Sequence, residues 1–276
     1  ADQPRAVSPN RHLSISAALN DFSLTVVPHV VEEEFLGRLI YAGGDDVLAM
    51  LPVADLLPAM QRLRLAYAGH DPAHEQGERD RQGLTLHRGF AMLRQGARMR
   101  LMRMMGHKAT ASAGGVIAHH QAPLGAVLRE LRAAESRAKN AGGRDAFSLT
   151  VVKRSGGALT VTAKWGEPVA LLDALRRWLG QDGVSRRAVY NSLDWIKDLP
   201  QDDPAMLASL LGYQLQRQAQ GDEARAQAPE LARRLAALAF DDALRPAPGS
   251  KDKRLDWLAH FMGVAEFLAR ETRSTD

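Results

Sequence analysis

Two short apolar runs separated by the quartet Gly-Gly-Asp-Asp constrain this sequence more than any other feature. The runs, residues 38–42 and 47–51, are too short for helices and do not alternate between apolar and polar residues, which is typical of strands covered on both faces. Gly43 and Gly44 accept the positive φ values that a tight turn needs, so the quartet predicts a β-hairpin. The chain should therefore contain a sheet with two carboxylates at the tip of one hairpin.

Those carboxylates, Asp45 and Asp46, suggest a metal site. Adjacent carboxylates repel one another and are costly beside a buried sheet unless a cation joins them. A hard ion such as Mg²⁺ takes one or two protein carboxylates and completes its shell with phosphate oxygens and water. The neighbouring Gly43 and Gly44 would let a bulky anion approach the backbone. A plain surface hairpin, with both aspartates facing water, stays open as an alternative, because turns favour Gly and Asp.

The segment before the hairpin predicts a helix. Its apolar residues recur at steps of three and four, the period of a helix with one buried face. They are Ile15, Leu19, Phe22, Val26 and Val30. Ser14 is the predicted N-cap, Gly37 lies just beyond the end, and Pro28 should kink the helix.

The remaining patterns divide the chain into a mixed part and a helical part. They predict a helix over 55–68 closed by Gly69, a strand over 110–119, a helix over 123–138, and a hairpin of strands 146–153 and 158–165. Beyond Trp165 the pattern is entirely helical, with segments near 168–180, 186–198, 204–220, 228–240 and 252–272 and an exposed loop over 241–252. The predicted fold class is therefore α+β for residues 1–166, followed by an all-α domain over 167–276.

The element order of the mixed part matches a ferredoxin-like unit without its opening strand. That strand lies in the middle of such a sheet, so its loss would expose backbone donors and acceptors on its neighbours. We therefore expect the chain to be a piece of a longer protein whose first strand lies upstream of Ala1.

Two basic residues are the predicted partners of a phosphate group. Lys139 and Arg144 flank the Gly-Gly that follows the helix over 123–138, and they would reach the phosphates of a nucleotide held at the hairpin tip. The alternative for Lys139 is an ion pair with Glu135 at i−4, at a helix end that favours cations. Ser16 and Asn20, one helical turn apart, are candidates for contacts to a base, or else form a plain polar face.

Three other polar clusters have an ordinary alternative. Residues 92–108 carry five basic residues, no acidic one and several methionines, which fits a docking strip for RNA or a neighbouring subunit, or an amphipathic helix with buried methionines. His119 and His120 have no third ligand at motif spacing, so we expect a structural or surface role rather than zinc binding. The run Glu32 to Glu34 predicts a solvated acidic turn rather than a contribution to the metal site.

Composition excludes several classes of protein. The 276 residues include no cysteine, which excludes disulfides and thiolate metal sites and suits a reducing cytoplasm. No apolar stretch approaches the roughly 18 residues of a membrane span, so we expect no membrane partner. The net charge of +4 is compatible with an anionic partner.

Three stretches together resemble a known family. "LIYAGGDDVLAMLP", "ATASAGGVIAHHQAPL" and "RAAESRAKNAGGRDAFSLTVVKRSGG" are similar to the large polymerase/cyclase-like subunit of type III CRISPR interference complexes, in the Cmr-type branch, from about Ser8 through Trp165. The resemblance implies a cytoplasmic complex with RAMP proteins, a small subunit, guide RNA and target RNA. In that family the palm domain with the GGDD hairpin makes cyclic oligoadenylate from ATP when target RNA binds.

The resemblance also implies roles for individual residues. Asp45 and Asp46 would ligate Mg²⁺ or Mn²⁺, and the 3′-hydroxyl of one ATP would attack the α-phosphate of another. Glycines would admit the triphosphate and basic residues would hold its phosphates; these are Gly43, Gly44, Lys139 and Arg144. GGDEF-type diguanylate cyclases share the skeleton, so cyclic di-GMP synthesis from GTP is a further alternative.

The sequence departs from the family in three respects. The acidic Asp-Gly-Asp motif that precedes the family's first helix does not occur before Ser14, and the HD nuclease domain and first palm are absent from this sequence. The resemblance therefore implies a second palm with a C-terminal helical domain, which we expect to be inactive alone. The alternative function is a non-catalytic scaffold that binds other effector subunits and guide RNA.

Overall fold

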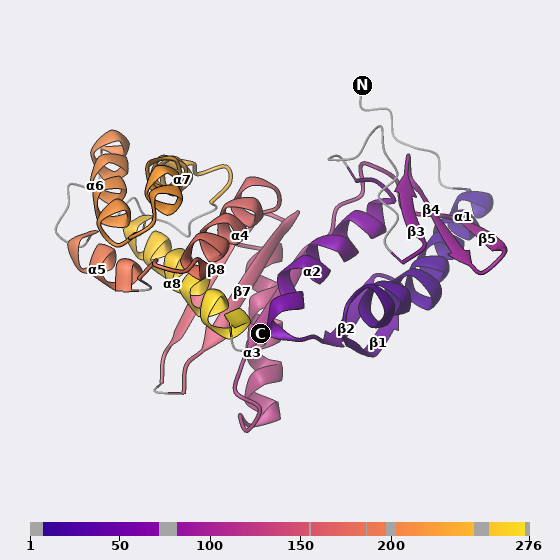
Figure 1. Cartoon of the computed structure of the whole chain (residues 1–276). Helices are drawn as coiled ribbons and strands as arrows, with labels where there is room; N and C mark the ends of the chain where they lie inside the picture. The colour runs from indigo at the N-terminus through magenta and orange to yellow at the C-terminus, as the bar shows by residue number, and fades with distance from the viewer. Residues whose placement is uncertain are drawn as a thin grey trace. The chain divides into compact units, whose positions relative to one another are not determined.

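The computed structural model describes residues 8–71, 82–154, 156–185, 187–196, 203–245 and 254–273. Packing divides the chain into two compact units, Ala1–Ala111 and Ser112–Asp276 (Figure 1). The predicted boundary near residue 166 separates a palm from a helical domain. It divides the chain by type of secondary structure, whereas the two units are defined by how the residues pack. That boundary stays a prediction.

The first unit contains helices and two antiparallel sheets. Its elements are α1 (Pro9–Asp21), the π-helical segments η1 (Phe22–Val26) and η2 (His29–Glu34), β1 (Arg38–Gly43), β2 (Asp46–Met50), α2 (Val53–Ala68), β3 (Leu84–His87), β4 (Phe90–Gln95) and β5 (Arg98–Arg103). Strands β1 and β2 form the predicted hairpin, and β3, β4 and β5 form a second sheet in that order. Helix α2 ends as predicted at Gly69, whose φ is +63°.

The N-terminal helix begins earlier than the sequence suggested. Ser8, not Ser14, is the N-cap: its Oγ accepts a hydrogen bond from the Arg11 amide at 3.4 Å, and Pro9 occupies the first turn, where its missing N–H costs nothing. Ser14 lies inside the helix and donates its hydroxyl to the Asn10 carbonyl at 2.9 Å. The prediction of Ser14 as N-cap is wrong because the stronger Ser-Pro start lies outside the apolar stripe.

Pro28 disturbs the helix, though through wider turns. Proline lacks the N–H that an α-helical turn needs, and its ring crowds the preceding turn. The segments on either side of it, η1 and η2, are π-helical, a geometry that absorbs one extra residue per turn. The predicted irregularity therefore appears as a change of helix type.

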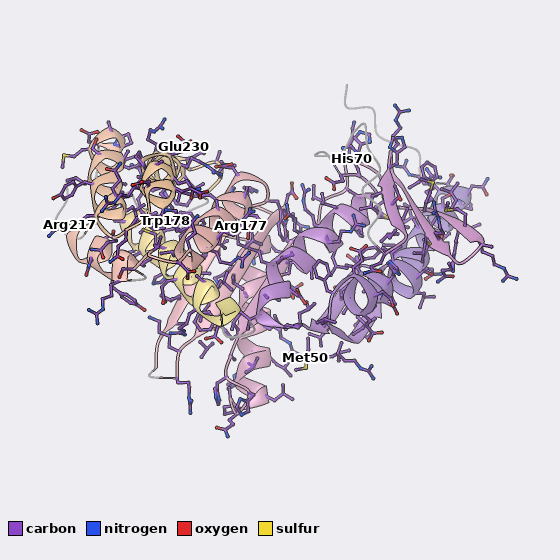
Figure 2. The ribbon with its side chains drawn as sticks, in the orientation of Figure 1. Met50, His70, Arg177, Trp178, Arg217 and Glu230 are labelled. Atoms are coloured by element: carbon purple, nitrogen blue, oxygen red, sulfur yellow. The ribbon has the colours of Figure 1, made fainter. Side chains whose placement is uncertain are left out.

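One face of the β1-β2 hairpin packs on the core of the first unit. The buried core comes from η1, η2, α2 and the second sheet, and includes Phe22, Val26, Val30, Ala59, Leu84, Leu93 and Met102. Leu39, Ala42, Val47 and Ala49 of the hairpin pack against it. The other face carries Ile40, Tyr41 and Met50, all more than half exposed, and the Met50 side chain extends outward (Figure 2). The prediction that both faces are covered is therefore wrong for the outer face.

The basic strip is also not helical. Residues 92–108, for which an amphipathic helix was one prediction, contain most of β4 and all of β5, joined by a turn at Gly96. Gly83, Gly89 and Gly96 all have positive φ and recur every six or seven residues. This spacing of turn residues is a signal for a meander of short strands, and it outweighs the helical spacing of the methionines.

The second unit contains one sheet and the helical remainder. Its elements are β6 (Ala113–Ile117), α3 (Leu124–Lys139), β7 (Ala146–Val152), β8 (Ala158–Lys164), α4 (Glu167–Gly180), α5 (Arg187–Ile196), α6 (Pro204–Arg217), α7 (Asp222–Phe240) and α8 (Arg254–Arg273). Strand β6 is parallel to β7, and β7 pairs with β8 in an antiparallel hairpin. The predicted strand, hairpin and five C-terminal helices are confirmed; the end of the predicted loop over 241–252 lies outside the described residues.

The α+β class with a helical C-terminal region is confirmed. Among the described residues, however, the strands form three separate sheets rather than one. The ferredoxin-like arrangement thus stays a prediction. No helix in the ranges that the structure describes is long and apolar enough to cross a bilayer.

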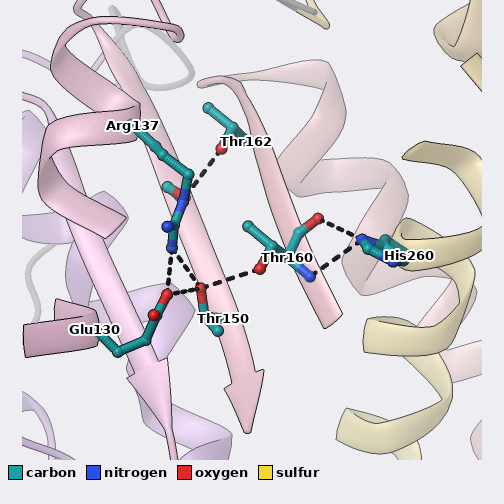
Figure 3. A network of polar contacts seen from close by, with 7 residues as sticks. Glu130, Arg137, Thr150, Thr160, Thr162 and His260 are labelled. Atoms are coloured by element: carbon teal, nitrogen blue, oxygen red, sulfur yellow. Dashed lines mark hydrogen bonds and ion pairs between the residues drawn. The ribbon is translucent and has the colours of Figure 1, made fainter. Parts of the chain in front are cut away.

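A polar network joins α3 to the sheet of the second unit (Figure 3). Arg137 donates to Glu130 at 2.6 Å and to the Thr150 hydroxyl at 2.7 Å, and its Nε reaches the Ser148 hydroxyl at 3.3 Å. Ser148 and Thr150 are fully buried in the central strand β7. Because buried hydroxyls must find partners, this network fixes how α3 lies on the strands.

Helix α8 covers the free edge of β8. The His260 ring lies 3.3 Å from the Thr160 amide nitrogen and 3.1 Å from its carbonyl oxygen (Figure 3), and the Trp257 indole donates to the Thr162 carbonyl at 3.0 Å. The side chains of α8 thus hydrogen-bond to backbone groups of β8 that would otherwise be available to pair with a further strand.

Candidate functional site

The Gly-Gly-Asp-Asp quartet forms the tip of the β1-β2 hairpin. Gly43 pairs with Asp46 across the strands, which leaves Gly44 and Asp45 as a two-residue turn. Gly44 has φ +62°, and glycine at the first turn position is typical of the type II′ hairpin. Asp45 and Asp46 are both exposed, so the hairpin presents two successive carboxylates to solvent.

The backbone at this tip is open at Gly44 and covered at Gly43. A side chain at Gly44 would meet nothing within 4 Å, whereas one at Gly43 would collide with the hydroxyl end of Tyr41. Tyr41 is 56% exposed and therefore has room to move aside. The turn thus offers a ligand direct access to the main chain beside Asp45.

The charge of the hairpin affects the pKa of Tyr67, which lies near the end of α2. Burial raises the pKa of Tyr67, and the nearby carboxylate of Asp45 raises it further because the phenolate would carry a like charge. Its ring also packs edge-on against Phe22 at 5.2 Å between centroids. The sequence predicted a helix over 55–68 that includes Tyr67, but no local pattern pointed to the nearness of Tyr67 to Asp45.

The two carboxylates suit a hard divalent cation. Carboxylate oxygens are the ligands that Mg²⁺ and Mn²⁺ prefer, and a nucleotide-bound ion needs only one or two of them from the protein. Asp45 and Asp46 supply that number at an open turn. Within the residues that the structure describes, no group of three or more His, Asp or Glu forms a complete metal site.

Lys139 and Arg144 belong to the second unit. The Lys139 Nζ lies 2.6 Å from the Glu135 carboxylate, so the predicted i, i+4 ion pair is confirmed. Arg144 is exposed on the loop after α3, with φ +61°, and its carbonyl accepts a hydrogen bond from Lys164 at 2.6 Å. The assembly of these residues with Asp45 and Asp46 into one nucleotide site stays a prediction.

Ser16 and Asn20 lie on the exposed face of α1. The Asn20 carbonyl accepts a hydrogen bond from Ser23 at 3.5 Å, which is ordinary within a helix. A contact of these two side chains with a base stays a prediction.

The acidic run at the end of η2 is only partly solvated. The Glu34 side chain is buried and pairs with Arg62 at 2.8 Å, so the prediction of a solvated turn is wrong for this residue. Its partner lies 28 residues away in sequence, and no local pattern points to it. Glu32 is nearer the surface and accepts a hydrogen bond from the Leu39 amide at 3.1 Å.

The rings of His119 and His120 lie against each other with centroids 4.1 Å apart and planes tilted by 38°. Desolvation, Arg154 and His120 lower the pKa of His119, in that order of effect. Within the described residues neither ring belongs to a group of three or more metal-binding side chains, and His120 is exposed.

Comparison with known proteins assigns a family to this architecture. Residues 2–148, just over half of the chain, match the family model "Cas10/Cmr2, second palm domain". "CRISPR system Cmr subunit Cmr2" of Pyrococcus furiosus is 31% identical over 198 residues, which cover 70% of this chain and 19% of that protein. "CRISPR system CMR subunit Cmr2" of Saccharolobus solfataricus is 46% identical over 63 residues, or 23% of this chain and 6% of that protein. The chain thus spans about a fifth or less of the length of these curated relatives.

A solved structure shares the fold. The cryo-EM structure titled "Type III-B Cmr-beta" in the apo state aligns with a TM-score of 0.54 and 20% identity, and the alignment covers 78% of this chain and 22% of that one. The alignment extends beyond the residues matched by the family model and so includes part of the helical region.

Proposed function

The chain belongs to the Cas10/Cmr2 family through its second palm domain, and we propose that its GGDD hairpin takes part in the synthesis of cyclic oligoadenylate from ATP. In this proposal the chain is the second palm and helical region of a Cmr2-like subunit in a type III CRISPR complex, acting in antiviral defence. The observation that carries the proposal is the pair of exposed, adjacent carboxylates at an open glycine turn.

The hairpin would bind the reacting end of the nucleotide. Asp45 and Asp46 would hold Mg²⁺ or Mn²⁺, which supplies charge stabilisation at the phosphates and activation of a hydroxyl. The uncovered main chain at Gly44 would contact phosphate oxygens closely, and Tyr41 would move away from Gly43 to extend that surface.

The basic residues of the second unit would hold the outer phosphates. Lys139 would exchange its Glu135 partner for phosphate when nucleotide binds. This exchange costs little, because an exposed ion pair such as this one contributes about 1 kcal/mol or less to stability. Arg144 has a planar guanidinium that suits bidentate phosphate binding, and its backbone is held by Lys164.

The test is product formation by the subunit assembled in its effector complex. ATP, Mg²⁺ or Mn²⁺ and target RNA are supplied, and cyclic oligoadenylates are resolved by chromatography. The double variant Asp45→Ala, Asp46→Ala should lose about a hundredfold or more in rate. Asp222→Ala, Glu223→Ala removes two adjacent exposed carboxylates from α7 and is the matched control. An undiminished rate in the hairpin variant would remove the enzymatic assignment, and product from GTP alone would point to cyclic di-GMP instead.

A scaffold role is the second candidate function. The outer face of the hairpin, with Ile40, Tyr41 and Met50, exposes apolar surface of the kind that protein interfaces cover. In this proposal RAMP proteins, the small subunit, guide RNA and target RNA are partners through the complex, in the cytoplasm. A hairpin variant that assembles normally but makes no product separates the two functions.

A further inference from the structure

We propose that one face of the β3-β4-β5 sheet binds single-stranded RNA. The part of this face that β4 and β5 form, here called the outer sheet face, consists of Phe90, Met92, Arg94, Met99, Leu101 and Arg103. The inference does not depend on the catalytic proposal, since these residues lie on a different sheet from the GGDD hairpin.

Strand register places these six residues on one side. Phe90 pairs with Arg103, Met92 with Leu101, and Arg94 with Met99, and directly paired residues point to the same face of a sheet. The opposite side carries Leu84, Leu93 and Met102, all buried in the core of the first unit. Strands β4 and β5 therefore have one side in the core and one side in solvent, whereas Thr85 of β3, which pairs with Met92 on the second side, is buried.

The outer sheet face exposes apolar side chains that its own unit does not cover. Phe90 is 41% exposed, Met99 57% and Leu101 64%. Single exposed apolar residues are ordinary, but three on one side of a small sheet form a contiguous patch, which marks a binding surface.

The charged residues within the sheet segment itself are all basic. Residues 82–111 contain six Lys or Arg and no Asp or Glu: Arg88, Arg94, Arg98, Arg100, Arg103 and Lys108. In the described part of the chain only Arg100 has a carboxylate partner, Asp21 at 2.8 Å, and the register puts Arg100 on the core side of the sheet. The cations of the outer sheet face therefore complement a polyanion.

The arrangement fits single-stranded RNA better than an acidic protein. Phe90 and Arg103 are cross-strand neighbours, so a base stacked on the ring would place its phosphate beside a guanidinium. Arg94 and Met99 again place a guanidinium beside an apolar side chain. This pair lies four residues along β4 from Phe90, about 13 Å away at roughly 3.3 Å per residue. Stacking requires bases that are free of a duplex, which selects a single strand.

Fluorescence anisotropy of the full chain tests this assignment. The probe is a fluorescein-labelled oligouridylate of about 12 nucleotides, within the range of site sizes of such surfaces. Phe90→Leu keeps an apolar side chain but removes the ring, and should weaken binding about fivefold or more. Arg103→Gln should also weaken binding and make the slope of log K against log salt shallower by about 0.7. Arg100→Gln is the matched control, since it removes the same charge from the same strand on the opposite face.

Three outcomes would overturn the assignment. The first is a wild-type affinity for Phe90→Leu and Arg103→Gln, and the second is equal weakening by Arg103→Gln and Arg100→Gln. The third is equal competition by a duplex, which would show that single strands are not selected, or by polyglutamate, which would indicate an acidic protein as the partner. Circular dichroism checks folding; if Phe90→Leu unfolds, Met99→Ser with Arg94→Gln, at exposed positions near the turn, replaces it with the same expectation.

Discussion

Glu34 and Arg62 form an ion pair that is buried on both sides. The Arg62 Nε lies 2.8 Å from a Glu34 carboxylate oxygen, and the two side chains are only 6% and 1% exposed, respectively. The same guanidinium donates to the Leu84 carbonyl at 2.9 Å. One pair thus joins η2, α2 and β3. The first two elements flank the GGDD hairpin in sequence, and β3 pairs with β4 of the outer sheet face.

Breaking this pair from one side should destabilise the chain strongly. Glu34→Ala leaves a buried guanidinium without its counter-charge, and we expect the free energy of unfolding to fall by about 3–5 kcal/mol. Urea denaturation followed by circular dichroism measures it. Glu33→Ala, at the exposed neighbouring position, should change stability by about 0.5 kcal/mol or less. Equal effects of the two substitutions would contradict the buried pair.

The titration of Tyr67 should report on Asp45. Burial and then Asp45 hold its pKa above 10.0, so Asp45→Asn should lower that pKa part of the way, since burial remains. Near-ultraviolet absorbance of tyrosinate, as a difference from Tyr67→Phe, follows this one group. Asp46→Asn is the matched control and should leave the midpoint unchanged; a shift of equal size there would refute the specific nearness of Asp45.

The same pKa predicts a direction for stability at alkaline pH. The folded chain holds the Tyr67 proton more tightly than the unfolded chain, whose pKa is near 10.0. Stability from this group is therefore complete below pH 10.0 and declines as the pH rises above it. In Tyr67→Phe this part of the decline should disappear, as urea midpoints measured on both sides of pH 10.0 would show.

Replacing Lys139 should affect nucleotide binding more than stability. If Lys139 holds phosphate, Lys139→Met raises the KM for ATP by roughly tenfold or more, because a charge-assisted hydrogen bond is lost. Glu135→Gln breaks the same ion pair but keeps the lysine, so its KM should be unchanged or lower. Both variants should have thermal midpoints close to that of the wild type, because an exposed ion pair contributes little to stability. An increase of KM in Glu135→Gln alone would reverse the assignment.

The turn at Gly44 should tolerate a side chain sterically but not conformationally. No atom lies within 4 Å of an added Cβ, so Gly44→Ala should cost only the penalty of positive φ, about 1–2 kcal/mol. Gly125→Ala is the reverse control: Gly125 lies in α3 with an ordinary φ, an added Cβ would meet only the Arg129 side chain at 3.7 Å, and the change should stabilise the chain by about 0.5–1 kcal/mol. Thermal unfolding of both variants measures these effects, and destabilisation by both substitutions would contradict this account.

Local sequence signals determined much of the fold. Glycine turns and apolar runs located the GGDD hairpin, and helical periodicity located α2, α3 and the five C-terminal helices. These elements depend on neighbours within a few residues, so a single sequence contains their causes. The β3-β5 sheet was missed because its methionines recur at helical as well as strand spacing, and only the spacing of the glycine turns resolves that conflict.

The chemistry of the GGDD tip was likewise determined by sequence, since two adjacent aspartates after two glycines limit what the turn can bind. Only the tertiary structure decided which charges are buried and which are free. Glu34 looks like its exposed neighbours until folding brings Arg62 to it from 28 residues away. Arg103 and Arg100 likewise differ only through strand register, which sends one to the solvent and the other toward Asp21. Desolvation and pairing are properties of residues distant in sequence, and the energies that separate these cases arise only when the chain packs.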